Sequence, residues 1–167
     1  MQKGIDELAE TRNESEAPQE EETQYPYVVR GATIYCTCGS HTRKLDMPVS
    51  HGSYIRDKAM LNNEDCKVGI DQNIPPFGAC FSSDKDGIAI KINDAEGLVP
   101  FTDEDGNPME VELPIEGKLC EPKITTKWQG AQEDTLVDGK PALKADCCIT
   151  CCYGGTIGFM DSGQEVY

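Results

Sequence analysis

Nine cysteines are the residues in this 167-residue chain whose chemistry is most distinctive. They fall into a leading pair, three separated residues and a closing cluster: Cys36, Cys38, Cys66, Cys80, Cys120, Cys147, Cys148, Cys151 and Cys152. In a reducing compartment, clustered thiols more often bind metal or pack than form disulfides. The odd number also argues against a complete disulfide framework.

The spacing of the thiols favours structural zinc among three interpretations. Cys148-Ile149-Thr150-Cys151 has the two-residue gap that lets both sulfurs reach one tetrahedral ion. On an extended strand Cys36-Thr37-Cys38 is too tight, because alternate side chains share a face but diverge. The two other interpretations stay open: thiols buried as small hydrophobic groups, and disulfides formed once the protein has left the reducing compartment.

A repeated Cys-x-x-Gly pattern indicates which thiols meet. Cys36 and Cys151 each begin one copy of the pattern, and Cys80 and Cys120 border the segment 81–119. We therefore predict that these four thiols converge on one structural zinc: Cys36, Cys80, Cys120 and Cys151. A closed four-thiolate site would be structural, not catalytic. The substitutes that we expect, if one of the four is absent, are Cys148 and His51.

Enzyme chemistry has little support in the sequence. The chain has two histidines, His41 and His51, and lacks Gly-x-Ser-x-Gly, His-Glu-x-x-His and a glycine-rich phosphate loop. A cysteine protease would need a histidine beside a thiolate such as Cys36, and no signature of such an enzyme is present. The acidic FTDEDGNP segment lacks the twelfth-position glutamate of a calcium loop. We expect no catalytic and no cofactor-binding residue apart from the zinc ligands.

The elements that must position these thiols are short strands. From residue 25 onward the chain alternates brief β-prone runs, such as YVVRGATIYC, GIAIKI and YGGTIGF, with turn signals such as Asp86-Gly87 and Asp138-Gly139. The only tryptophan, Trp128, is expected in the core. The sequence thus predicts an all-β domain over residues 26–167.

The interior contains a weak duplication. Residues 54–61 (YIRDKAML) parallel residues 136–143 (LVDGKPAL), and both copies read as a strand, a tight turn, a lysine and an apolar stretch. A second pair links residues 34–39 (IYCTCG) with 149–154 (ITCCYG). We predict two copies of one β-turn unit, separated by an insertion at about 81–119.

The amino-terminal segment and the overall charge limit the partners. Residues 1–25 carry the acidic run Glu20-Glu21-Glu22 and little to bury, which predicts a flexible tail or, alternatively, a docking segment for an effector or chaperone. A net charge of −15 disfavours nucleic acid and anionic lipid. No signal-like segment or long apolar run is present, so we expect a cytoplasmic protein without stable membrane insertion.

Five blocks of sequence resemble a PAAR-like family, whose members are relatives of PAAR proteins and carry a domain-of-unknown-function label. These blocks are GATIYCTCGS at 31–40, NIPPFGAC at 73–80, LCEP at 119–122, DGKPALK at 138–144 and CCYGGTI at 151–157. The resemblance covers about residues 26–164. Pro141-Ala142-Leu143-Lys144 stands where PAAR proteins have Pro-Ala-Ala-Arg, so two of four residues match.

The resemblance implies a small β-cone that caps a trimeric VgrG-type spike of a contractile injection or type VI secretion system. Such a tip protein is not an enzyme: it binds in one copy per spike, sharpens it for membrane piercing and helps to recruit effectors. It stays in the cytoplasm of the producing bacterium until it is injected, and is then delivered outside the cell or into a target cell. PAAR proteins hold an apical metal mainly through histidines with a cysteine, and this cysteine-rich chain departs from that pattern. The alternatives are an effector or toxin with its activity in the insertion, and a cytosolic zinc or thiol adaptor module.

Overall fold

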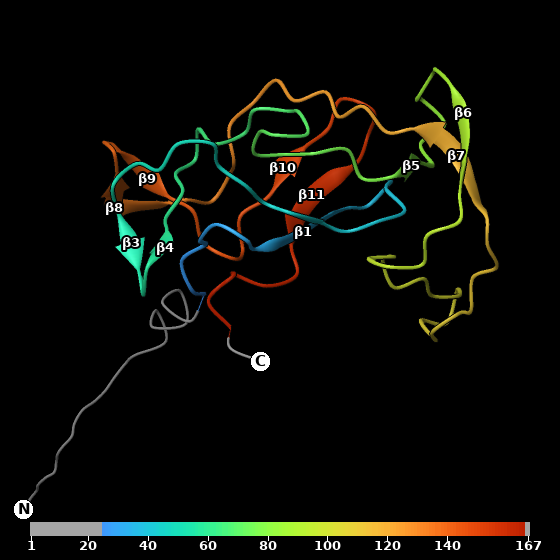
Figure 1. Ribbon diagram of the computed structural model, residues 1–167, viewed down its shortest axis with the longest axis horizontal. Helices are drawn as coiled ribbons and strands as arrows, with labels where there is room; N and C mark the ends of the chain where they lie inside the picture. The colour runs from blue at the N-terminus through green and yellow to red at the C-terminus, as the bar shows by residue number, and fades with distance from the viewer. Residues whose placement is uncertain (1–24, 166–167) are drawn as a thin grey trace, which may run out of the picture.

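The computed structural model describes residues 25–165, and this part of the chain contains eleven β-strands and no helix. The prediction of an all-β domain is confirmed. The strands are two to six residues long and form several small sheets rather than one large one (Figure 1). The predicted acidic tail lies, except for residue 25, outside the described residues.

A four-stranded sheet forms the middle of the domain, in the order β10-β11-β1-β2 (Figure 1). Its strands are β1 (Thr33–Cys36), β2 (Arg43–Lys44), β10 (Ile149–Thr150) and β11 (Thr156–Phe159). Both β1 and β10 pair antiparallel with β11, so they run parallel to each other. The carboxyl ends of β1 and β10 therefore lie at the same edge of the sheet.

Two hairpins with the same turn lie at one end of the domain (Figure 1). One joins β3 (Tyr54–Ile55) to β4 (Lys58–Ala59), and the other joins β8 (Gln132–Val137) to β9 (Lys140–Ala142). Both central residues of each turn have positive φ, as the tight type I′ turn requires: Arg56 (49°), Asp57 (69°), Asp138 (53°) and Gly139 (80°). The backbone thus repeats where the sequence predicts a duplication.

The two copies of the hairpin unit also contact each other through corresponding residues. The Leu143 N–H donates to the Leu61 carbonyl at 3.1 Å, and both side chains are fully buried. These leucines end the matching segments 54–61 and 136–143. The duplication therefore produces pairing between the copies and not only similar local shapes.

A three-stranded sheet with the order β5-β7-β6 lies at the opposite end of the domain from the hairpins (Figure 1). It contains β5 (Ala79–Cys80), β6 (Ala89–Ile92) and β7 (Ile115–Leu119). Ala79 pairs with Leu119, so the chain that departs after Cys80 returns beside it at Cys120. The segment 81–119 is therefore joined at its base.

The domain has a main core and a separate small one. Trp128 is 2% exposed, stacks on Phe159 at 4.9 Å and donates its indole N–H to the Asp65 carbonyl at 2.8 Å, which confirms its prediction as a core residue. The small core lies among the hairpins and has four buried members: Val29, Met60, Val137 and Ala142.

Candidate thiol site

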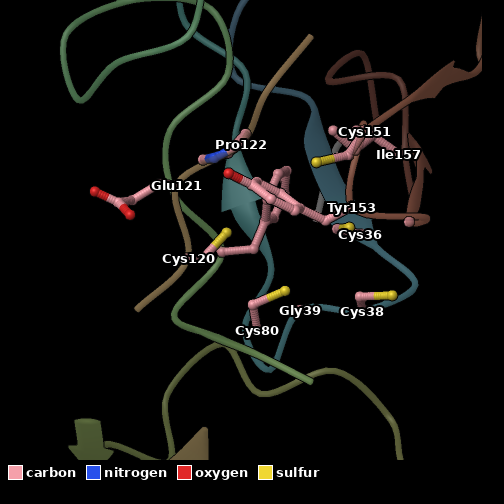
Figure 2. A pocket seen from close by; sticks show the side chains of 12 residues that line it. Cys36, Cys38, Gly39, Cys80, Cys120, Glu121, Pro122, Cys151, Tyr153 and Ile157 are labelled. Carbon is pink, nitrogen blue, oxygen red and sulfur yellow. The ribbon is translucent and has the colours of Figure 1, made fainter. Parts of the chain in front are cut away.

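Five cysteines line one small cavity between the central sheet and the base of the segment 81–119 (Figure 2). They are the four thiols that the sequence predicts to converge, together with one more: Cys36, Cys38, Cys80, Cys120 and Cys151. The cavity leaves about 10 Å³ of free space for a water-sized sphere. A space of that size holds about one water molecule or one ion.

Matching turns bring the first two thiols together. β1 ends at Cys36, whose carbonyl accepts the Gly39 N–H at 2.9 Å, and the Cys151 carbonyl accepts the Gly154 N–H at the same distance. Because β1 and β10 run parallel on either side of β11, both turns lie at one edge of the sheet. The equivalence of Cys36 and Cys151 follows from this arrangement.

Backbone hydrogen bonds attach the other two thiols to the first turn. Gly39 forms an isolated antiparallel bridge with Cys80, and the Phe81 N–H donates to the Cys38 carbonyl at 2.7 Å. The Cys120 N–H donates to the Gly78 carbonyl at 3.0 Å. Residues far apart in sequence are thus held around one point by main-chain contacts.

The glycine after the second turn closes one wall of the cavity. A Cβ atom on Gly155 would lie 2.5 Å from the Cys36 sulfur, which is closer than real Cβ contacts occur. The thiol of Cys36 therefore packs directly against bare backbone. Any larger residue at position 155 would displace this thiol.

Burial makes two of the thiols weak acids. It raises the pKa of Cys36 to about 12 and that of Cys120 to about 11, and the neighbouring thiols add to both shifts. Backbone hydrogen bonds oppose the shifts, from Cys38 to Cys36 and from Phe77 to Cys120. The Lys123 N–H also donates to the Cys151 sulfur at 3.4 Å. Cys36 and Cys120 are neutral thiols at pH 7 unless a cation in the cavity favours the thiolates.

The donor set fits zinc better than it fits a hard cation. Thiolate sulfur is the ligand that structural zinc sites use, and four cysteines from four segments match its preferred number. Among residues 25–165, however, no group of three or more His, Cys, Asp or Glu side chains is arranged to hold a metal ion, and the cysteines are free thiols. Zinc binding stays a prediction, and it requires thiol side chains to turn inward.

The predicted substitute ligands lie elsewhere. Cys148 is exposed and does not line the cavity. His51 contacts two carboxylates instead, with Nε2 at 2.9 Å from Asp65 and Nδ1 at 3.2 Å from Asp138. The other histidine, His41, is buried beside Ser40, and its Nδ1 lies 2.7 Å from the hydroxyl oxygen.

Cys38 is the cavity residue that the sequence analysis excluded. The exclusion assumed an extended strand across Cys36-Thr37-Cys38, whereas β1 ends at Cys36 and the chain turns. The following Gly39 was the available signal of this turn. In Figure 2 the Cys38 sulfur points away from the other four, so Cys38 borders the cavity as a spare thiol.

The fold and the site define a small all-β domain with a buried thiol cluster. Residues 28–164 match the family described as a domain of unknown function, DUF4280, and the chain belongs to this family. No curated protein and no solved structure matches the chain significantly. Within residues 25–165 there is no helix that is long and apolar enough to cross a membrane.

Proposed function

We propose that this chain is a structural tip protein of the PAAR-like kind, which caps a trimeric VgrG-type spike of a contractile injection or type VI secretion system in one copy. The role needs a shaped, stable domain rather than an active site. The observation that supports it best is a group of three tight turns at one end of the domain, two of which belong to matching hairpins.

The third turn unit lies at the start of the described chain. There the Ala32 N–H donates to the Val29 carbonyl at 3.1 Å across a turn in which Gly31 has a φ of 97°. Val29 also forms an antiparallel bridge with Met60, which follows the β3–β4 hairpin. This turn at 30–31 thus packs beside the hairpin whose turn is at 56–57.

The three units share a small apolar core. The residue before each turn is apolar, and all three belong to or pack against the same cluster: Val29, Ile55 and Val137. A single chain that meets a threefold-symmetric partner needs three similar contact elements, because each partner subunit presents the same surface. One copy of this domain provides two matching hairpins and one further turn beside them.

Exposed apolar side chains at this end fit a docking role. Tyr54 and Leu136 occupy corresponding positions of the two hairpins and are 56% and 58% exposed. Large apolar side chains left exposed on matching elements suit an interaction surface. We assign the hairpin end to the spike, and the opposite end, with β5, β6 and β7, to the outward side (Figure 1).

Within this proposal the thiol site is a structural cross-link. Zinc held by Cys36, Cys80, Cys120 and Cys151 would fix the segment 81–119 to the central sheet and contribute directly to the free energy of folding. A narrow tip has little room for a large apolar core, so such a cross-link has a clear mechanical use. The tail at 1–25 is assigned to recruiting an effector or chaperone.

Co-purification with the trimeric spike protein from the same genome tests the proposal. We expect a complex of one chain with three spike chains, and at least tenfold weaker binding for Tyr54→Asp combined with Leu136→Asp. Ile70→Asp is the matched control, because Ile70 is 80% exposed and lies outside the hairpins. A stable homotrimer with no affinity for the spike would contradict the proposal. Killing of target cells by the chain alone would favour the effector alternative, and thiol exchange would favour the adaptor.

A further inference from the structure

Lys85 is a buried lysine beside the thiol site. Its side chain is 1% exposed, although it lies in the otherwise exposed segment that follows Cys80. Burying an ammonium group costs free energy unless charged or polar partners compensate it. The position of Lys85 therefore calls for a specific partner.

The contacts of the Lys85 ammonium come from the rim of the thiol cavity. Its Nζ donates to the Glu121 carboxylate at 3.1 Å and lies 5.3 Å from the centre of the Tyr153 ring. Glu121 and Tyr153 both line the cavity. A third contact is with the Asp86 carbonyl, which accepts a hydrogen bond from the same Nζ.

The backbone leaves room for this ammonium group. A Cβ atom on Gly87 would lie 2.9 Å from Lys85 Nζ, and Gly87 has a φ of 134° that favours glycine. The chain at 85–87 therefore passes close to the amine.

The ion pair with Glu121 does not by itself offset the free-energy cost of burying the Lys85 ammonium group. The Glu121 side chain is 65% exposed, so water already solvates the carboxylate, and exposed carboxylates add little to an ion pair. In Figure 2 this carboxylate points away from the cysteine sulfurs. Lys85 does not line the cavity itself and reaches its rim through Glu121 and Tyr153.

We propose that Lys85 is the counter-cation of the thiol site, which offsets the negative charge of the ligating thiolates and so sets the metal affinity. This inference rests on the zinc cross-link of the proposed function. A zinc ion with four thiolates carries two net negative charges in a site with little water, and a fixed cation nearby stabilises that state. Lys85 touches no metal and acts through its charge.

Zinc affinity of the full chain, measured by competition with a chromophoric zinc chelator, tests the proposal. Lys85→Met keeps the length of the side chain and removes its charge, and we expect at least about tenfold weaker zinc binding. Lys91→Met on β6 removes an exposed charge from the same segment and should change the affinity less than twofold. Glu121→Gln should tighten binding about two- to fivefold, because it removes a negative charge near the site.

The outcomes distinguish an effect of the Lys85 charge on zinc binding from a purely structural role of Lys85 in the segment 81–119. Weaker binding in Lys85→Met, with tighter binding in Glu121→Gln, supports the proposal. Unchanged zinc affinity in a folded Lys85→Met chain overturns it. If Lys85→Met does not fold, Glu121→Gln decides, since weaker or unchanged binding there overturns the proposal. A wild-type chain that binds no zinc overturns both the metal site and this role of Lys85, whereas spike binding is measured separately and can still succeed.

Discussion

The hairpin end and the thiol site are stabilised by different physics. At the hairpin end, positive-φ turns and a small apolar core hold segments that are close in sequence or that pair strand to strand. At the thiol site, four segments separated by up to 115 residues meet around a cavity with five sulfurs. Both ends join segments that are far apart in sequence, but backbone pairing and apolar burial hold the hairpin end, while the thiol site depends, by our proposal, on metal.

Removal of the ligating thiols should have the largest effect. With free zinc at about 1,000 times the Kd, bound metal contributes roughly 4 kcal/mol to the free energy of unfolding. We expect chelation to lower the thermal midpoint of the wild-type chain and to leave Cys36→Ser combined with Cys120→Ser unaffected. Elemental analysis should find one zinc in the wild type and none in the variant.

The control for this prediction uses the exposed thiols. Cys148→Ser combined with Cys152→Ser removes two cysteines that lie outside the cavity. This variant should keep its zinc and its response to chelation. The prediction is contradicted if the wild-type chain contains no metal and the Cys36 and Cys120 substitutions do not change its melting temperature. These thiols would then act only as packing groups.

Alkaline pH should produce the next largest effect, and only in the metal-free chain. Folding raises the pKa of Cys36 from 9.0 to about 12 and that of Cys120 from 9.0 to about 11. The unfolded chain therefore releases these protons first, so stability is full below pH 9 and falls as pH rises toward 11 and 12. Denaturant titrations from pH 8 to 11, with and without zinc, measure the loss. An equal loss in both samples would show that metal does not engage these thiols.

A shortened side chain in the small core of the hairpin end should lower the stability by the same amount with and without zinc. Val137 is fully buried in the small core, and Val137→Ala removes two methyl groups at a cost of about 2 kcal/mol. We expect the same loss with and without a chelator, because distant sites without shared partners add independently. A loss that changes by more than about 1 kcal/mol on chelation would show that the two regions are coupled.

The smallest predicted effect comes from substituting the second turn residue of each hairpin. Gly139 has a φ of 80° and the corresponding Asp57 has a φ of 69°. Gly139→Ala should cost about 1 kcal/mol in a left-handed conformation. Asp57→Gly should change the stability by only a few tenths of a kcal/mol. Chemical denaturation of both variants measures the difference, and equal effects would contradict the equivalence of the turns.

Local patterns explain what the sequence could predict. The type I′ turns follow from residue pairs such as Asp138-Gly139, and the glycines at 39 and 154 mark the matching thiol turns. Convergence of the four thiols followed from the duplication and from the two borders of the segment 81–119. These are inferences from short stretches whose conformation depends mainly on their own residues.

Tertiary contacts explain what the sequence could not predict. The turn at 30–31 lacks the lysine of the two hairpins, and only the bridge between Val29 and Met60 places it beside them. Burial of Lys85 depends on Tyr153 and Glu121, which follow it by 68 and 36 residues. Nothing in the residues next to Lys85 distinguishes it from an exposed lysine.

Native mass spectrometry of the chain expressed together with the trimeric spike protein that we propose as its partner tests the central claim most directly. We predict one assembly that contains three spike chains, one copy of this chain and one zinc ion, and that loses this chain when Tyr54 and Leu136 are replaced by aspartate. If spike trimers and free chains stay separate at protein concentrations at which the proposed complex should form, the assignment of this domain as a spike tip is contradicted.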